Sequence, residues 1–265
     1  MDSRREGALT SPDSLSWRIF KNPVAMFIGG ITAVLLELAE PRVRSGVWDH
    51  TSFRRDPLRR MRRTGLAAMV TVYGPRSQAE RMIAAIREMH DRVTGTTPSG
   101  EPYRANDPQL LAWVHVTASF GFIEAYARFV RPLDDRDRDR FYAEGTEIAA
   151  LYGAPDVPAT EAQRLERFNE MFPLLEPSPI VFEFLDILDR TRILPRPMIG
   201  LQRTMIRASI DILPRNVRER LELGTEYDLK KRGHRLVAWL GRHSERFPVP
   251  ERSVRQGLRM GDSIS

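Results

Sequence analysis

The feature that most constrains this chain is the segment from Pro108 to Ile123, which contains no Asp, Glu, Lys or Arg. It follows Asp107, and an Asp-Pro pair typically begins a helix, which here is expected to continue to about Val130. Apolar residues lie all around this helix rather than along one face, a pattern typical of a helix buried inside a domain. A chain of 265 residues can bury such a helix within one domain.

Helix signals recur through the rest of the chain. Asn22-Pro23 begins an apolar run that ends before Pro41, and Asp56-Pro57 begins the next segment. Further helices are predicted over residues 24–38, 58–73, 77–93, 133–152, 160–172, 178–190, 197–212, 214–221 and 227–243, with a loop over 94–106. The sequence therefore predicts an all-α, single multi-helix globular domain over residues 17–245. Residues 1–16 are expected to be a flexible N-terminal tail, and 246–265 a C-terminal helix and tail.

The absence of cysteine excludes several chemistries. Disulfides, thiolate zinc sites, iron–sulfur clusters and Cys nucleophiles are ruled out, which leaves His, carboxylates, Tyr and Met as metal ligands. The paired Glu-x-x-His motifs of a carboxylate di-iron bundle are missing. So are the His-Glu-x-x-His, Walker, Gly-x-Gly-x-x-Gly and Gly-x-Ser-x-Gly motifs. Hydrolase, kinase and nicotinamide-enzyme functions therefore lose their usual support.

No targeting segment is visible at the N-terminus. The most apolar early run, Val24 to Leu36, has 13 uncharged residues before Glu37, whereas a membrane-spanning helix needs about 20. We expect a cytoplasmic protein with no transmembrane span, and peripheral membrane contact stays open.

The basic residues are unevenly distributed between the two types. The chain has a formal charge of +6, and only three of its 41 basic residues are lysines, Lys21, Lys230 and Lys231. Six arginines lie between Arg54 and Arg63. They could form a solvated face, a phosphate-binding patch as in nucleic-acid proteins, or a clamp for buried carboxylates such as haem propionates. The residues alone favour the solvated face. We attribute the overall positive charge to a codon bias toward Arg rather than to a nucleic-acid or membrane partner.

Among the five histidines, His115 stands out because it lies in the middle of the least polar segment. At helical spacing it shares a stripe with Leu111, Ala118, Ser119 and Phe122. A buried imidazole needs a partner, and burial without one costs about 1–3 kcal/mol. Two interpretations stay open at this point: a core histidine with a local hydrogen bond, which is the commoner case, or a metal or haem ligand. His234 and His243 lie in a basic segment and are expected at the surface.

The order of the segments resembles the MpaB-type and rubber (latex-clearing) oxygenase family. The resemblance covers roughly residues 17 to 240, and each piece is short, so their shared order and spacing carry it. The matching residues are Gly29, Gly30, Ala33, Leu35, Leu36, Pro41, His50, Phe53, Arg54, Asp56-Pro57, Arg60, Arg63-Thr64-Gly65, Tyr73-Gly74, His90, Val93, Gly95, Tyr103, Ala105, Asp107-Pro108, Leu110-Leu111, Trp113-Val114-His115, Thr117, Pro132-Leu133 and Phe141-Tyr142-Ala143-Glu144.

This resemblance implies an all-α protein that binds haem b through one axial histidine. The Trp-Val-His block places that iron ligand at His115, with Trp113 beside the cofactor. A cysteine-free chain with a buried apolar helix agrees with a neutral imidazole as ligand.

The latex-clearing relatives border the distal pocket with an Arg-x-x-Lys-Thr segment, which corresponds here to Arg60, Arg63 and Thr64. Arg63 replaces the lysine, and a guanidinium stays protonated, so it cannot ligate iron as a neutral amine could. The resemblance implies catalytic roles for Arg60 and Thr64 and a cofactor contact for Arg63. Given a haem, Arg59 and Arg62 of the arginine run are expected to contact its carboxylates. The chain departs from the family at Thr32 and Glu37, where Arg and Gln are frequent, and it lacks the acidic residue that many relatives carry after the histidine.

The expected function is that of a haem-b-dependent oxygenase that oxidises an apolar substrate with dioxygen. Cleavage of a carbon–carbon double bond is the family-like outcome, with Arg60 and Thr64 stabilising the developing negative charge. One alternative is a non-catalytic haem-binding or haem-sensing protein. Another is an arginine-rich helical nucleic-acid-binding regulator, which is the weaker because no short basic recognition helix follows a turn.

Overall fold

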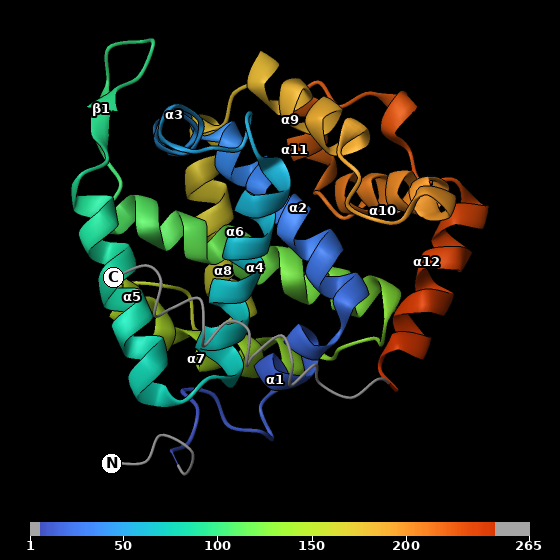
Figure 1. The fold of residues 1–265 in the computed structure, drawn as a ribbon, viewed down its shortest axis with the longest axis horizontal. Helices are drawn as coiled ribbons and strands as arrows, with labels where there is room; N and C mark the ends of the chain where they lie inside the picture. The colour runs from blue at the N-terminus through green and yellow to red at the C-terminus, as the bar shows by residue number, and fades with distance from the viewer. Residues whose placement is uncertain (1–5, 247–265) are drawn as a thin grey trace.

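The structure, a computed structural model, describes residues 6–246. Two long helices pack closely at its centre, α2 (Pro23–Ala39) and α6 (Pro108–Phe129), and the other helices surround them (Figure 1). These are α1 (Leu15–Lys21), α3 (Pro41–His50), α4 (Pro57–Tyr73), α5 (Arg76–Asp91), α7 (Asp135–Tyr152), α8 (Glu161–Met171), α9 (Pro179–Arg190), α10 (Ile199–Asp211), α11 (Arg215–Arg220) and α12 (Lys231–Ser244). The predicted all-α fold is confirmed.

Polar residues followed by proline begin the helices that position the site. The side chains of Asn22, Asp56 and Asp107 each accept hydrogen bonds from backbone N–H groups in the first turn of α2, α4 and α6. The proline that follows each of them has no N–H to leave unsatisfied. The predicted starts of these three helices are therefore confirmed, and so is their cause.

The crossing of α2 and α6 is a backbone contact. Gly29 and Gly121 face each other, and a Cβ atom added to Gly29 would lie 2.7 Å from the carbonyl oxygen of Gly121. The core continues along α6 through Trp113, Phe120 and Ile123, which are all buried. Because no side chain larger than hydrogen fits between them, the glycines fix how closely the two central helices approach.

Two helices and one hairpin differ from the sequence prediction. Helices α1 and α3 were not predicted, and the expected loop over 94–106 contains a hairpin of β1 (Thr94–Thr96) and β2 (Pro102–Arg104). The loop prediction is wrong there because strand pairing is not a local property. Gly95 is paired with Tyr103, and a Cβ atom at residue 95 would lie 2.6 Å from the Tyr103 hydroxyl.

The two predicted terminal segments lie partly outside the described residues. Of the tail expected over 1–16, the described part contacts the domain: the Glu6 carboxylate accepts hydrogen bonds from Ser77, and the Thr10 hydroxyl donates to the Val72 carbonyl. Helix α1 begins at Leu15. The helix and tail expected over 246–265 lie outside the described residues apart from Arg246.

By length and composition alone, α6 could cross a membrane, and α1 with α2 passes the same test as a pair bent by 95°. In the fold, 67% of the apolar stretch of α6 is buried among the surrounding helices. This burial is what the sequence predicts for a central core helix.

Candidate functional site

His115 lies near the middle of α6 with one weak polar partner. Its Nε2 atom lies 3.3 Å from the Ser119 hydroxyl oxygen, one helical turn away. The side chain is only partly buried by surface area, yet it lies so deep that desolvation lowers its pKa from 6.5 to about 4. The imidazole is therefore neutral at physiological pH, which is the form that ligates a metal.

The space beside this imidazole depends on Gly145 of α7. A Cβ atom at residue 145 would lie 3.0 Å from Nε2 and 3.1 Å from Cε1 of His115. Any side chain at this position would therefore cover the nitrogen that could bind a metal. Residue 145 keeps the imidazole edge free of side-chain atoms from α7.

Beside His115, helix α4 packs only loosely against the closely packed pair α2 and α6. Along α2 and α6 a stripe of residues at helical spacing is only partly buried, and all five residues from Gly65 to Met69 of α4 share this state. A Cβ atom added to Gly30 or Gly65 would have no atom within 4 Å. This loosely packed region comprises Phe27, Gly30, Val34 and Glu37 of α2, Gly65, Leu66, Ala67, Ala68 and Met69 of α4, and Leu111, Val114, His115, Ala118 and Phe122 of α6.

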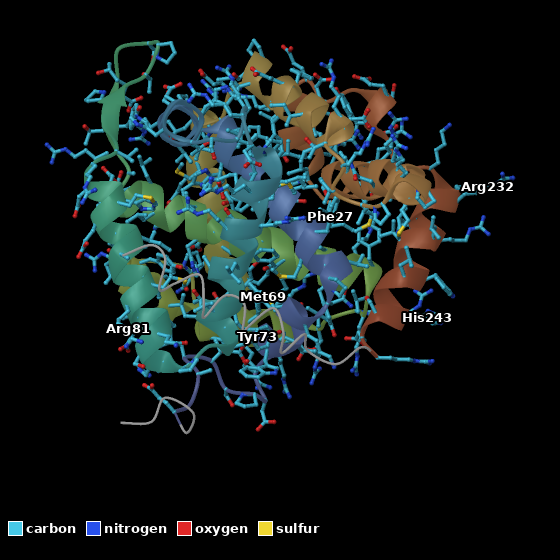
Figure 2. All side chains as sticks on the ribbon, viewed as in Figure 1. Phe27, Met69, Tyr73, Arg81, Arg232 and His243 are labelled. Carbon is cyan, nitrogen blue, oxygen red and sulfur yellow. The ribbon has the colours of Figure 1, made fainter. Side chains whose placement is uncertain are left out.

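Helix α4 is held near its C-terminal end rather than along its length. The Tyr73 hydroxyl donates to the Trp17 carbonyl oxygen at 2.6 Å, and the Thr71 hydroxyl lies 3.4 Å from that of Tyr152. Figure 2 shows Met69 and Tyr73 on this half of α4 and Phe27 on α2. These contacts anchor the C-terminal end of α4, while space stays open at Gly30 and Gly65.

Glu37 and Arg60 bring opposite charges to one end of this region. Burial raises the pKa of Glu37 from 4.5 to about 7, against the opposing effects of the Arg60 guanidinium and the Thr117 hydroxyl. Burial also lowers the pKa of Arg60, against the effect of Glu37, although a guanidinium stays charged. Glu37 therefore exchanges a proton near neutral pH beside a fixed cation.

His90 of α5 lies within the electrostatic reach of Arg60. Burial, followed by the Arg60 charge, lowers its pKa, and its Nδ1 atom is buried without a hydrogen-bond partner. Three helices thus bring Glu37, Arg60 and His90 together. Of these residues, only Arg60 was predicted from the sequence as a site residue.

The remaining predicted residues of the arginine segment point to solvent. Arg59, Arg62, Arg63 and Thr64 are exposed, and the Thr64 hydroxyl donates to the Arg60 carbonyl at 3.1 Å. Arg54 is paired with Glu183 at 2.8 Å. Of the run from 54 to 63, Arg60 is the arginine that lies near Glu37 and His90, and the roles of the others stay predictions.

Trp113 lies in the core. It is fully buried, its ring centroid lies 5.3 Å from that of Phe168, and its Nε1 atom has no hydrogen-bond partner. Its predicted contact with a cofactor stays a prediction. The two histidines expected at the surface differ, since His243 is exposed whereas His234 is partly buried against Phe129 at 5.3 Å.

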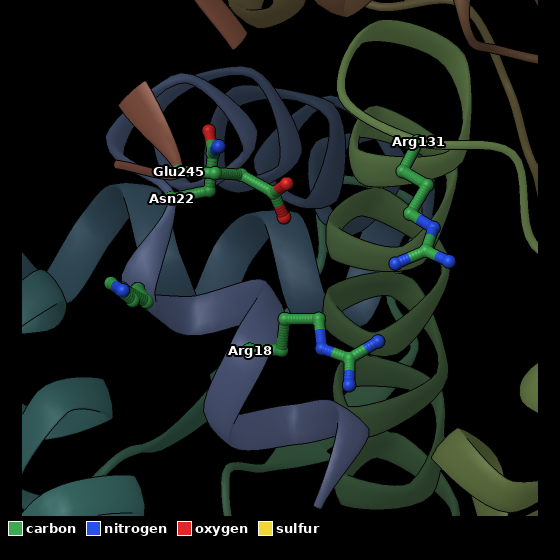
Figure 3. Close-up of a pocket in the computed structure, with 5 residues that line it drawn as sticks. Arg18, Asn22, Arg131 and Glu245 are labelled. Carbon is green, nitrogen blue, oxygen red and sulfur yellow. The ribbon is translucent and has the colours of Figure 1, made fainter. Parts of the chain in front are cut away.

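Two surface pockets lie away from His115. One is lined by Arg18, Lys21, Asn22, Arg131 and Glu245 (Figure 3), and the other by residues 48–52 together with Arg54 and Arg55. Neither offers an apolar lining for an apolar substrate. Within residues 6–246, no group of three His, Asp or Glu side chains could hold a bare metal ion, whereas a haem needs only one axial ligand from the protein.

Glu37, His90 and Gly145 are the site residues that sequence reasoning did not assign. The sequence shows Glu37 only as a departure from the resembled family, although it is the first charge after a long apolar run. Gly145 lies in a mainly charged helix and carries no sequence signal of its own. Its role depends on the approach of α7 to α6.

The comparisons with known proteins point to one family. A family model described as "ER-bound oxygenase mpaB/B'/Rubber oxygenase, catalytic domain" matches residues 17–243. No curated protein and no solved structure matches the chain.

Proposed function

The chain belongs to the mpaB and rubber oxygenase catalytic-domain family, and from this premise we propose that it is a haem-b-dependent oxygenase acting on an apolar substrate with dioxygen. The observation that carries the proposal is His115. It is a neutral imidazole deep in the domain, partly exposed, weakly bonded to Ser119 and kept clear by Gly145.

The residues present fit haem b in three respects. His115 supplies one uncharged nitrogen ligand, the only type of ligand that haem requires from this cysteine-free chain. The loosely packed region supplies apolar surface with open space at Gly30 and Gly65. Arg60 supplies a partly buried cation that suits a carboxylate such as a propionate.

When bound, the haem iron would supply the binding and activation of dioxygen. The chain's own residues perform the remaining tasks. The apolar side chains of the loosely packed region would orient an apolar substrate and exclude water. Arg60 would stabilise negative charge that develops during oxidation. Glu37, with a pKa of about 7, can hold or release a proton at neutral pH.

Roles for Thr64 and Arg63 are proposed on the family resemblance alone, and those of Arg59 and Arg62 on their place in the arginine run. Thr64 would have to turn its hydroxyl from the Arg60 carbonyl in order to act as a donor. The three exposed arginines would contact the cofactor's carboxylates at the rim of the region. Trp113 would support the cofactor from the core side of α6.

Haem titration of the purified protein tests the proposal. We expect a Soret band with stoichiometric haem, and its loss in His115→Ala, whereas His50→Ala should keep it because His50 is exposed and bonded to Tyr103. Gly145→Ala should also lose haem although the histidine is intact, because the new Cβ atom would lie 3.0 Å from Nε2. Gly200→Ala is the matched control, since its Cβ atom would meet no atom within 4 Å.

Full haem uptake by a folded His115→Ala protein, with an unchanged spectrum, would rule out this ligand. Oxygen consumption by the haem-loaded protein with unsaturated apolar compounds then separates an oxygenase from a protein that only binds haem. An anaerobic reaction should give no product.

A further inference from the structure

Helix α12 presents two opposite faces. Val237, Ala238, Gly241 and Ser244 are buried against the domain. The other face is exposed along the whole helix, and in Figure 2 the labelled Arg232 and His243 point away from the domain. Its exposed residues are Lys231, Arg232, Arg235, Leu236, Trp239, Arg242 and His243. We call these seven residues the outer face of α12.

Two large apolar side chains lie in the middle of this outer face. Leu236 is 44% exposed and Trp239 is 51% exposed, three residues apart on the same side of the helix. The Trp239 and His243 ring centroids lie 4.4 Å apart. The other large exposed apolar residues of the described chain lie one to an element: Met89, Leu165, Leu174 and Met198. An isolated exposed apolar residue is ordinary, whereas an adjacent pair on one face indicates a contact surface.

The charges around this pair are of one sign. Between Asp228 and Glu245 the chain has no acidic residue, while Lys230 and the four basic residues of the outer face are all exposed. Within the described residues, none of these five cations takes part in an ion pair. Arginines elsewhere on the surface are often paired, as Arg203 is with Asp189 at 2.7 Å.

The pocket of Figure 3 lies at the C-terminal end of the same helix. The Asn22 side-chain amide, which lines this pocket, donates to the Gly241 carbonyl of α12 at 2.9 Å. The pocket adds three cations, Arg18, Lys21 and Arg131, and one carboxylate, Glu245, which accepts a hydrogen bond from Tyr126. Three further cations therefore lie near the C-terminal end of α12, beside its buried face and apart from the outer face.

We propose that the outer face of α12 docks on an anionic lipid surface. A basic helix face with Trp and Leu between its cations suits the headgroup boundary of a membrane, where Trp is favoured and lipid phosphates pair with Lys and Arg. A nucleic acid would use the cations but has no partner for Leu236. A second copy of the same face would bring like charges together.

Co-sedimentation with vesicles tests this proposal. We expect binding to phosphatidylcholine vesicles that contain phosphatidylglycerol, and at least tenfold weaker binding to phosphatidylcholine alone. The double variant Arg232→Glu/Arg235→Glu should weaken binding by at least about 25-fold, since each cation near an anionic surface contributes about fivefold. Arg81→Glu is the matched control, because Arg81 is exposed on α5 at the opposite side of the molecule in Figure 2.

The apolar part of the contact is tested separately. Leu236→Ser/Trp239→Ser should weaken vesicle binding by about tenfold or more, even at a salt concentration that screens the charges. Leu165→Ser, on a residue of similar exposure (49%), should bind as the parent does. The emission of Trp239 should shift to shorter wavelength on binding, and this shift should be absent in a Trp239→Phe variant.

Vesicle binding that survives both double variants would overturn the proposal. So would binding of duplex DNA that depends on the same arginines while anionic vesicles are not bound. The test is independent of the proposed oxygenase function, since His115→Ala should bind vesicles normally. Loss of haem and loss of lipid binding are therefore distinguishable failures.

Discussion

Gly29 and Gly30 are neighbours on α2, yet their surroundings are opposite. A Cβ atom at Gly29 would collide with the Gly121 backbone, whereas one at Gly30 would meet nothing within 4 Å. The first glycine belongs to the crossing of α2 and α6, and the second to the loosely packed region beneath α4. Glycine thus allows two helix backbones to approach closely at position 29, whereas at position 30 it borders open space.

The difference shows how the fold divides its tasks. The crossing holds the two helices that carry Glu37 and His115, and backbone contact allows it little freedom. The loosely packed region forgoes the stabilisation that filled apolar space would give, at roughly 25 cal/mol per Å² of surface buried. A bound apolar group would recover this energy. A rigid crossing beside the open space at Gly30 and Gly65 is an arrangement that suits a cofactor or substrate site.

The largest expected effect on stability comes from disrupting the crossing of α2 and α6. Gly121→Ala should destabilise the protein by on the order of 3 kcal/mol, because the new Cβ atom meets backbone that cannot move aside without separating the helices. Gly30→Ala should leave stability unchanged or raise it. Urea unfolding followed by circular dichroism measures both. Equal destabilisation by the two substitutions would remove the distinction between the regions.

How far the sequence predicts each region follows from the same contrast. The helices of the crossing are encoded locally, by Asn22-Pro23, Asp107-Pro108 and apolar runs, and these predictions are confirmed. The crossing glycines Gly29 and Gly121 cannot be paired from sequence, because they lie far apart in the chain. The two unpredicted helices, α1 and α3, are short, and short segments give a weak periodic signal.

The site is predicted less completely than the fold. His115 could be singled out because an imidazole in an uncharged helix is conspicuous. The approach of Arg60 to Glu37 joins residues on different helices, and the adjacent arginines give no hint that Arg60 alone turns inward. Gly145 matters only because it places no side chain beside the His115 imidazole. Properties of the space between helices are set by packing rather than by local sequence.

The next effect concerns pH and the two shifted groups of the region. Glu37 has its pKa raised from 4.5 to about 7, so the folded state binds an extra proton between these values, and stability falls as pH rises through them. His115 has its pKa lowered from 6.5 to about 4, so the unfolded state binds the extra proton, and stability rises with pH over that window. The two slopes oppose each other in the haem-free protein.

A single substitution at Glu37 should therefore isolate the pH dependence of stability that comes from His115. Glu37→Gln should raise the free energy of unfolding at pH 8 by on the order of 2 kcal/mol and have little effect at pH 4. In this variant, the free energy of unfolding should increase as the pH rises from about 4 to 6.5, the range set by the two pKa values of His115. Urea unfolding of the haem-free protein across pH 4 to 8 measures this. A Glu37→Gln protein whose stability at pH 8 equals that of the parent would show that this carboxylate is not desolvated.

The smallest expected effect on stability tests whether the cofactor occupies the open space beside Gly65 of α4. Gly65 lies inside α4 and its Cβ atom would meet no atom within 4 Å, so Gly65→Ala should stabilise the haem-free protein by about 0.5–1 kcal/mol through helix propensity alone. If haem occupies the loosely packed region, the same methyl group loses its free space, and the gain should shrink or change sign when the protein is saturated with haem. Thermal unfolding with and without haem measures this difference.

Gly200→Ala, on α10, is the control whose effect should not depend on haem, since its surroundings are equally open but it lies outside the region. An identical gain for Gly65→Ala in both states would mean that the open space beside Gly65 is not where the cofactor lies.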